Sequence, residues 1–254
     1  METGPKEIIK RFRSFLKDSI RQEVDFSATE QARGLPPPPI EKPWDPNAKR
    51  LDLLGTDNWP NIGPVTLDRA IRGRESRRRY SRAPLLLDEL AFLLWATQGI
   101  RKRLDMGTAL RTVPSAGARH ALETYLCVMN VQGLEPGIYR YLPLENQLLH
   151  VAAVPDLGDR LTVATLGQSF AGRSVVTFVW TAIPHRMEWR YGLAAHKVIA
   201  LDAGHVCQNL YLACEAIGAG TCAIAAYDQE AMDRLLGVDG QDEFTVYLAP
   251  VGKV

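Results

Sequence analysis

The run RESRRRY at positions 74–80 carries a dense set of anion-binding side chains. A phosphate dianion needs several charge-assisted donors in a small space, and guanidinium groups supply paired N–H donors while a serine adds a hydroxyl. The same run would also suit a solvated basic surface or an RNA-contacting patch. Its meaning therefore depends on the segments that accompany it.

Two stretches of small residues could approach a flat ligand closely. In RTVPSAGARH (111–120), Pro114 fixes the backbone, Ser115 offers a hydroxyl, and Ala116 and Gly117 leave space. GAGTCAIAAYD (218–228) contains a GxGxxA string, but a dinucleotide fingerprint needs a strand before it and a helix after it. Here a predicted helix precedes and an apolar, strand-like stretch follows. We therefore expect backbone N–H groups of this second stretch to reach a flat molecule, and no Rossmann site.

A third segment, EWRYG (188–192), places Arg190 beside Tyr191. Both side chains can bind an anion, and the tyrosine can also pass a proton in general acid or base catalysis. The alternative is that they simply close a loop. The sequence contains no P-loop, no HExxH and no GxSxG string, and its five histidines lack ligand spacing. It therefore predicts neither a metal site nor a hydrolase.

The overall charge hides a local excess. The chain has 254 residues, 46% of them hydrophobic, and a formal net charge of +1. These figures fit a globular protein with a sizeable core and disfavour a broadly basic nucleic-acid binder. Residues 69–119, however, hold eleven arginines and one lysine against four acidic residues, a local net charge of +8. Positive charge is thus concentrated around the first two segments.

The sequence predicts a cytoplasmic protein without a membrane anchor. No uncharged apolar run approaches the roughly 20 residues that span a bilayer, and the start METGPKEIIKRF lacks the apolar segment of a signal peptide. The four cysteines lie in apolar stretches without metal-type or disulfide-type spacing. We expect them to be reduced thiols in the core.

The elements that must position these segments are helices and strands in a mixed order. An amphipathic packing helix is predicted over 5–21, with one apolar face made by Ile8, Phe12, Phe15, Leu16 and Ile20. Prolines over about 33–65 predict an extended arm on the surface. Further predicted helices cover 84–99, 156–166 and 202–217, and predicted strands cover 123–131, 137–142, 147–151, 174–181 and 243–251. The first three strands suit a meander, and the lack of a βαβ rhythm favours an α+β fold.

In this order, the segments resemble the flavin-dependent nitroreductase superfamily, and within it the SagB-type dehydrogenase branch, which includes azoline oxidases of peptide natural-product pathways. The matching strings are RESRRRYSRAPLLLDELAFLLWATQGI (74–100), RTVPSAGARHALETYL (111–126), EWRYG (188–192) and DAGHVCQNLYLACEAIGAG (202–220). The resemblance divides the chain into an N-terminal helix and arm (1–69) and an FMN-binding domain (70–254). It implies a mixed, mainly antiparallel sheet flanked by helices, and a homodimer with FMN at the interface.

The resemblance also implies the cofactor site. The R-x-S-x-R signature for the FMN phosphate and ribityl chain matches Arg74, Ser76 and Arg78. A basic residue after the last strand, which joins the phosphate site in relatives, matches Lys253. Glu75 stands where many relatives carry a second arginine, which lowers the charge of the predicted phosphate site.

The flavin ring would meet two further segments. The Pro-Ser loop of the family, which approaches the flavin from this subunit or its partner, matches the positions from Pro114 to Gly117. The stretch over the N5 and O4 region matches Ala225 and Ala226, acting through backbone N–H groups. Ala118 stands where the family usually has asparagine.

The activity that the resemblance implies is hydride transfer through flavin N5, with NADH or NADPH reducing FMN and a small organic molecule as acceptor. The alternative is oxidation of a thiazoline or oxazoline in a modified peptide. Azoline oxidases carry a Lys-Tyr pair where this chain has Arg190 and Tyr191. Because arginine is a poor base, the replacement favours the reductase. A flavin-free module that binds an anion or RNA is a more remote alternative.

Overall fold

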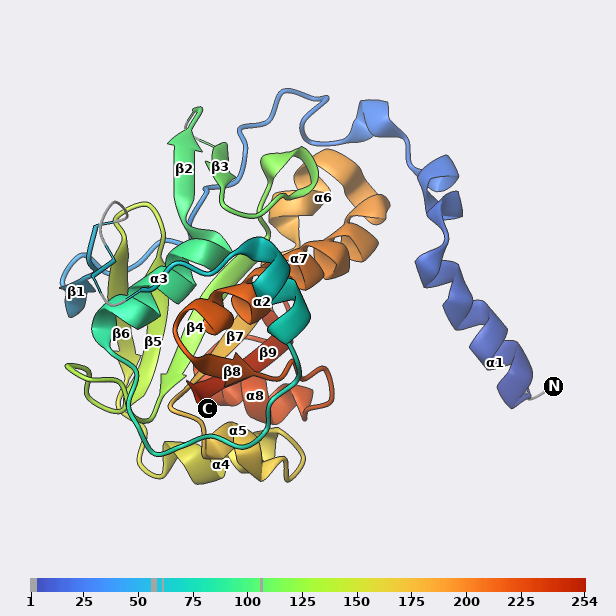
Figure 1. Cartoon of the computed structure of the whole chain (residues 1–254). Coiled ribbons are helices and arrows are strands. Elements are labelled where there is room, and N and C mark those ends of the chain that lie inside the picture. Colours follow the sequence, from blue (N-terminus) through green and yellow to red (C-terminus); the bar gives the residue numbers. More distant parts are fainter. Residues whose placement is uncertain (1–3, 56–58, 61, 106) are drawn as a thin grey trace.

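The computed structural model describes residues 4–55, 59–60, 62–105 and 107–254, and a seven-stranded sheet forms its centre (Figure 1). The strand order is β1-β6-β5-β4-β7-β9-β8, and every pairing between these strands is antiparallel. The strands are β1 Arg50–Asp52, β4 Leu122–Val128, β5 Gly137–Leu142, β6 Gln147–Ala152, β7 Val176–Ala182, β8 Ala219–Thr221 and β9 Phe244–Lys253. A separate hairpin pairs β2 Ile100–Arg103 with β3 Ala109–Arg111. The predicted α+β class and the meander β4-β5-β6 are confirmed.

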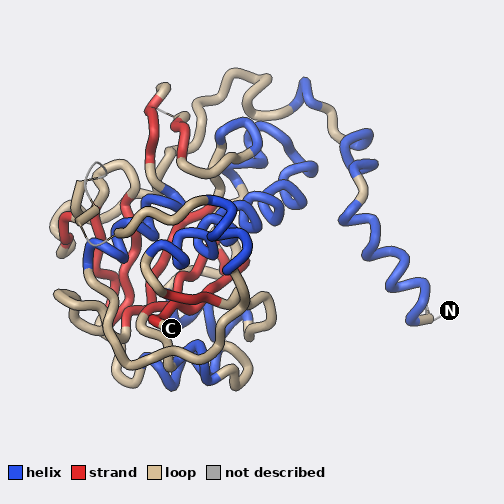
Figure 2. The backbone as a smooth tube through the Cα atoms, in the orientation of Figure 1, coloured by secondary structure: helices blue, strands red, loops and turns tan. Residues whose placement is uncertain are grey.

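Helices cover both faces of the sheet (Figure 2). One core lies between the sheet and helices α3 and α7, and a second lies between the sheet and helices α4 and α8. Because side chains alternate along a strand, Leu126 of β4 joins the first core while its neighbours Tyr125 and Cys127 join the second. The helices are α1 Pro5–Phe12, α2 Leu67–Gly73, α3 Leu87–Gln98, α4 Leu157–Ala164, α5 Ser169–Gly172, α6 His185–Tyr191, α7 Ala195–Ala216 and α8 Gln229–Leu236.

The two longest helices carry the main core. Helix α3 is apolar around most of its surface and buries Leu90, Leu93 and Leu94 completely, as its composition predicts. Helix α7 starts seven residues before its predicted start. The segment AHKVIAL continues the apolar spacing toward the N-terminus, with Ala195 and Ile199 buried on the same side as the rest of the helix. Helix α7 is therefore long enough to pass several parts of the sheet.

The N-terminal helix differs from its prediction. Helix α1 ends at Phe12, and short 3₁₀ turns follow at Arg13–Leu16 and Asp18–Glu23. The segment runs away from the sheet (Figure 1), so that Phe12 and Leu16 are 66% and 73% exposed instead of packed on the domain. A helix this short gains little from its own hydrogen bonds, because most helix stability comes from packing.

The proline-rich arm is more buried and more regular than the extended surface arm that the sequence predicts. Its positions 56–58 and 61 lie outside the described residues. Ile40 and Glu41 are buried, and the proline-free stretch around Leu51 forms β1, which extends the sheet beside β6. The prediction of an arm without regular structure is therefore wrong for this stretch.

A buried ion network ties the arm and α6 to the sheet. The Glu123 carboxylate on β4 accepts hydrogen bonds from Arg186 Nη2 at 2.5 Å and from the Lys42 backbone N–H at 3.0 Å. Arg140 Nε lies 3.9 Å from the same carboxylate. Burial raises the pKa of Glu123, but the two guanidinium groups outweigh it and hold the pKa below its usual value. The charged form of Glu123 is thus the stable one in this core.

Two further features concern the whole chain. None of the described helices is long and apolar enough to cross a membrane. All four cysteines are buried and unpaired, which confirms the prediction of core thiols.

The Glu123→Gln variant should be strongly destabilised. It removes the carboxylate and leaves Arg186 and Arg140 as buried, uncompensated charges, a change that costs about 3 kcal/mol in the free energy of unfolding. Urea denaturation followed by circular dichroism measures this loss.

Glu230→Gln serves as the control, because Glu230 pairs with Arg234 at 4.0 Å on the exposed side of α8. An exposed pair of this kind contributes less than about 1 kcal/mol. Equal losses in the two variants would show that the Glu123 network does not stabilise the fold.

Candidate functional site

The arginine-serine segment 74–78 runs in extended form beside β8. Ser76 forms a parallel bridge with Thr221, and the Arg77 N–H donates to the Thr221 carbonyl at 2.9 Å. The Arg77 side chain packs on Gly220, where an added Cβ would lie 2.4 Å from Arg77 Cδ. Gly220 thus makes room for this segment of the same chain. In an extended segment, alternate side chains point the same way, so Arg74, Ser76 and Arg78 are presented on the side opposite Arg77.

Tyr211 of α7 organises the start of this segment. Its hydroxyl lies 3.0 Å from Ser76 Oγ and accepts a hydrogen bond from the Ala223 N–H at 2.8 Å. Since its oxygen accepts from Ala223, its own proton is available to Ser76. The Arg74 guanidinium carbon lies 5.3 Å from the centre of the same ring, within range of a cation–π contact. Tyr211 therefore joins α7 to two segments that the sequence placed in one predicted site, the arginine-serine segment and the stretch that contains Ala223.

The other two basic residues of the predicted phosphate site have different neighbours. The Arg78 guanidinium lies 5.9 Å from the ring centre of Phe170 on α5. The Lys253 ammonium donates to the Glu89 carboxylate and, at 2.6 Å, to the Ile217 carbonyl. Lys253 is thus already neutralised within the chain, whereas Arg74 and Arg78 form no ion pair among the described residues. Glu75 pairs with Arg77 at 2.9 Å and leaves both of those guanidinium groups free.

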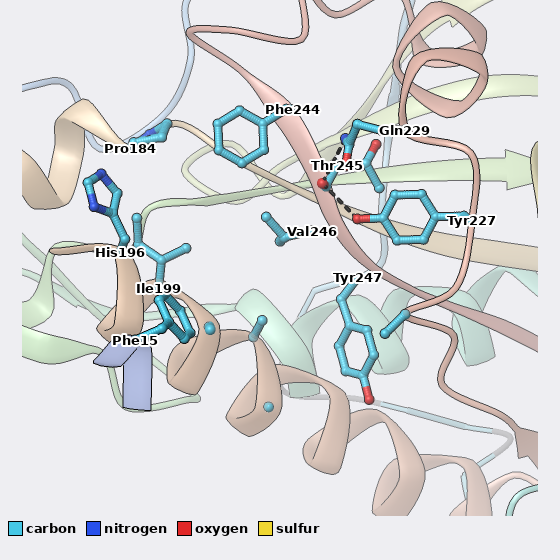
Figure 3. A pocket seen from close by; sticks show the side chains of 14 residues that line it. Phe15, Pro184, His196, Ile199, Tyr227, Gln229, Phe244, Thr245, Val246 and Tyr247 are labelled. Atoms are coloured by element: carbon cyan, nitrogen blue, oxygen red, sulfur yellow. Dashed lines mark hydrogen bonds between the residues drawn. The ribbon is translucent and has the colours of Figure 1, made fainter. Parts of the chain in front are cut away.

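A cavity of about 600 Å³ lies beside Ala225 (Figure 3). Its walls come from the outer face of α7, from β9 and from the loop that begins at Ala225, and Phe15 adds an aromatic ring from the N-terminal segment. The volume falls within the range of small-molecule sites. The backbone N–H groups of Ala225 and Ala226 make no hydrogen bond within the described part of the chain, although the Ala226 carbonyl accepts from Gln168 at 2.8 Å. The unused Ala225 N–H therefore lies at the wall of a ligand-sized cavity, and the unused Ala226 N–H follows it in the chain.

The wall opposite α7 is fixed by hydrogen bonds to one carbonyl. Tyr227 and Gln229 both donate to the Thr245 carbonyl, at 2.8 Å and 3.0 Å (Figure 3). Phe244, Val246 and Tyr247 complete this mainly apolar surface. Such a surface suits a flat, apolar ligand whose polar edge reaches the free N–H groups.

The Pro-Ser loop has an unusual backbone. Gly117, Ala118 and His120 have φ angles of 58°, 53° and 46°. The left-handed region costs a residue with a side chain about 1–2 kcal/mol, although asparagine tolerates it better than alanine. Ala118 therefore bears strain that an asparagine at this position would reduce. Backbone strain of this kind is concentrated at functional sites.

Helix α7 also anchors this loop. Asp202 is buried, and its carboxylate lies near the Ser115 hydroxyl and the Ala116 N–H, beside a small space that Ser115 and Asp202 both line. Burial raises the pKa of Asp202, while the nearby Ser115 and Ala116 donors act in the opposite direction. Ser115 Oγ in turn accepts from the His120 N–H at 2.9 Å. Asp202 and Tyr211 are the two residues that hold the predicted segments, and nothing in their sequence spacing indicated those contacts.

The structure brings the Pro-Ser loop together with Arg190 and Tyr191. These two residues end α6, and both pack on Gly117. A Cβ added at Gly117 would lie 2.6 Å from Tyr191 Oη and 3.0 Å from Arg190 Cδ. Gly117 is thus required both for its backbone conformation and for this close contact.

Within one chain the predicted site residues form two separate groups along α7. Asp202 holds the Pro-Ser loop and its neighbours, and Tyr211 holds Arg74 and Ser76. The two anchors are nine positions apart, about 14 Å along a helix axis. No group of three or more metal-binding side chains occurs among the described residues.

If the site holds the FMN that the resemblance implies, the Tyr211→Phe variant should bind it about tenfold more weakly than the wild type. The ring and its contact with Arg74 stay, but the hydroxyl that joins Ser76 to the Ala223 N–H is lost, and each such hydrogen bond contributes about 1 kcal/mol. Titration of the apoprotein with FMN, followed by quenching of flavin fluorescence, measures the dissociation constant.

Tyr139→Phe is the matched control, since its hydroxyl donates to the Glu135 carbonyl at 2.9 Å on a different part of the sheet. It should keep the wild-type FMN affinity. If Tyr211→Phe binds FMN as tightly as this control, Tyr211 does not organise the phosphate end.

Comparison with known proteins identifies relatives of this chain. MJ1384 of Methanocaldococcus jannaschii is 31% identical over 194 residues, which cover 76% of this chain and 94% of that protein. The name of MJ1384 describes it as a nitroreductase. The microcin B17-processing protein McbC of Escherichia coli is 24% identical over 139 residues, or 53% of this chain and 51% of McbC.

Solved structures show the same fold. A Ralstonia eutropha structure described as a nitroreductase has a TM-score of 0.67 at 23% identity and covers 87% of this chain and 99% of its own. A chain of the E. coli microcin synthetase McbBCD complex has a TM-score of 0.59 at 21% identity and covers 77% of this chain and 76% of its own. The sequence pattern of the Nitroreductase family matches residues 71–253, and the chain belongs to this family of oxidoreductases.

Proposed function

We propose that the protein is an FMN-dependent oxidoreductase that uses NADH or NADPH to reduce a small organic acceptor. The single observation that carries the proposal is the unused N–H donor of Ala225 at the wall of the cavity of about 600 Å³, with the unused N–H of Ala226 next to it in the chain. When bound, FMN supplies the redox chemistry, since its N5 atom accepts and releases hydride. The residues of the protein would bind and orient FMN and would neutralise its negative charge.

The phosphate end would be held by Arg74, Ser76 and Arg78. Both guanidinium groups lack an ion-pair partner among the described residues, and Ser76 is positioned by Tyr211. Charge-assisted donors of this kind bind phosphate strongly. Lys253 would join only by giving up Glu89, so we assign it a supporting role through that buried pair.

The ring end would use residues from both groups along α7. Ala225 and Ala226 would donate to the flavin edge, while Tyr191 offers a hydroxyl that can donate or accept a proton at the substrate. Within one chain, the 14 Å between Asp202 and Tyr211 along α7 separates the Pro-Ser loop from the arginine-serine segment that would hold the phosphate. We therefore propose a homodimer in which the loop from Pro114 to Gly117, with Ser115 and Ala116, approaches the flavin of the partner.

Azoline oxidation in a modified peptide is the second candidate. The similarity to McbC, a microcin-processing protein, favours it. Arg190 weighs against it, because a guanidinium is a poor base and cannot readily remove a ring proton. Tyr191 would then have to act as the base alone.

The purified protein should be yellow, with the visible absorption of bound flavin, or should become so after incubation with FMN. Anaerobic mixing with NADH or NADPH should then bleach the flavin rapidly. A colourless protein that takes up no FMN contradicts the cofactor assignment, whereas a flavoprotein that neither nucleotide reduces favours the azoline oxidase over the reductase.

The Gly117→Ala variant should lose at least tenfold in acceptor turnover. The added Cβ would displace Tyr191 and Arg190, in addition to the left-handed strain of about 1–2 kcal/mol. Gly133→Ala is the control, because Gly133 has a φ of 86° but no neighbouring atom within 4 Å. Both variants should melt at lower temperature, but only Gly117→Ala should lose turnover. Equal activities would show that the contact with Tyr191 is not needed.

A further inference from the structure

Arg190 is a half-buried cation without a counter-charge. Among the described residues it forms no hydrogen bond and no ion pair, and its guanidinium lies 5.5 Å from the ring centre of Tyr191. The acidic residue nearest in sequence, Glu188, instead pairs with His196 at 2.8 Å. The Arg190 N–H donors therefore have no partner within this part of the chain.

A second guanidinium increases the positive potential at this place. Arg119 is buried, with its guanidinium 5.0 Å from the ring centre of Trp189, and it donates to the Gly107 carbonyl and to Thr108. Burial lowers the pKa of Arg119, and the charge of Arg190 lowers it further. The acidic residue that acts on Arg119 is Asp105, which is exposed and accepts from the Gly107 N–H at 2.8 Å. The positive charges of Arg119 and Arg190 thus repel each other, and among the described residues neither guanidinium forms an ion pair with a carboxylate.

Leaving a half-buried guanidinium unpaired is unfavourable, and an arriving anion would relieve it. The Arg190 side chain lies on Gly117, directly beside the Tyr191 hydroxyl that the proposed function places at the substrate. A planar guanidinium with paired N–H donors matches a carboxylate, which it can bind through two parallel hydrogen bonds.

We propose that Arg190 binds a carboxylate on the substrate, so that the enzyme selects acceptors that carry this group close to the reacting atoms. This inference rests on the proposed function, because it places the carboxylate at the same site. It explains an arginine at this position without giving it a role in proton transfer. It applies to a small aromatic carboxylate and equally to a carboxylate of a peptide.

Binding of two matched probes, 4-nitrobenzoate and the neutral 4-nitrobenzamide, tests the proposal by titration calorimetry on the purified protein. The wild type should bind the carboxylate at least tenfold more tightly than the amide. Arg190→Gln should remove this preference, and Arg190→Lys should keep part of it because the charge remains. Arg234→Gln is the control, since Arg234 is an exposed arginine on α8, and it should keep the full preference.

Three results would overturn the proposal: no preference in the wild type, an unchanged preference in Arg190→Gln, or an equal weakening of both probes in that variant. The flavin content of each preparation, measured by absorption, separates this test from the cofactor assignment. A flavin-free protein that prefers the carboxylate would support the role of Arg190 and contradict the proposed function. A protein that contains flavin but does not prefer the carboxylate would contradict the role of Arg190 and leave the cofactor assignment supported.

Discussion

The packing of α7 against the sheet is the constraint on which the candidate site depends. Its 22 residues make a helix about 33 Å long, and its buried side chains form much of the larger core. Asp202 and Tyr211 extend from the same rigid helix toward the Pro-Ser loop and the arginine-serine segment. The separation between these two segments is therefore set by a helix that cannot shift without disturbing the core.

The local charge excess divides into structural and unpaired arginines. Arg111 is buried and donates to Gln98 and to the Ile40 carbonyl, which fastens the N-terminal arm to the domain. Arg77 pairs with Glu75, and Arg119 supports the turn at Gly107. Arg74 and Arg78 remain without ion pairs among the described residues, as does Arg190 on α6. Arg69, Arg72, Arg79, Arg82 and Arg101 also form no ion pair among the described residues, so the absence of a partner alone does not distinguish the arginines of the proposed site.

The Pro-Ser loop combines strain with support. Its left-handed residues are unfavourable by themselves, and the hydrogen bond from the His120 N–H to Ser115 Oγ and the contact of Gly117 with Tyr191 hold them in place. A loop held in this way keeps a fixed surface toward a ligand, since relaxing the backbone would break those contacts. The same contacts place Arg190 beside Tyr191, so the residue proposed to transfer a proton and the residue proposed to bind a carboxylate share one support.

The sequence by itself determined the fold class, the meander of β4, β5 and β6 and the positions of β7 and β9 along the chain, and it indicated the segments proposed for the site. Alternation in the strands and apolar spacing in α3 and α7 are local patterns, so they can be read without knowing the partners. The sequence did not determine the length of the N-terminal helix or the strand in the arm, because packing partners distant in the chain decide whether such segments hold regular structure.

Only the tertiary structure decided how the site residues are grouped. Lys253 is joined to Glu89, 164 positions away, and Ser76 is joined to Tyr211, 135 positions away. Neither contact has a signal in local spacing. The sequence supplied the chemical groups, whereas the pairing of each group with a neighbour depended on how α7 and the sheet bring distant segments together.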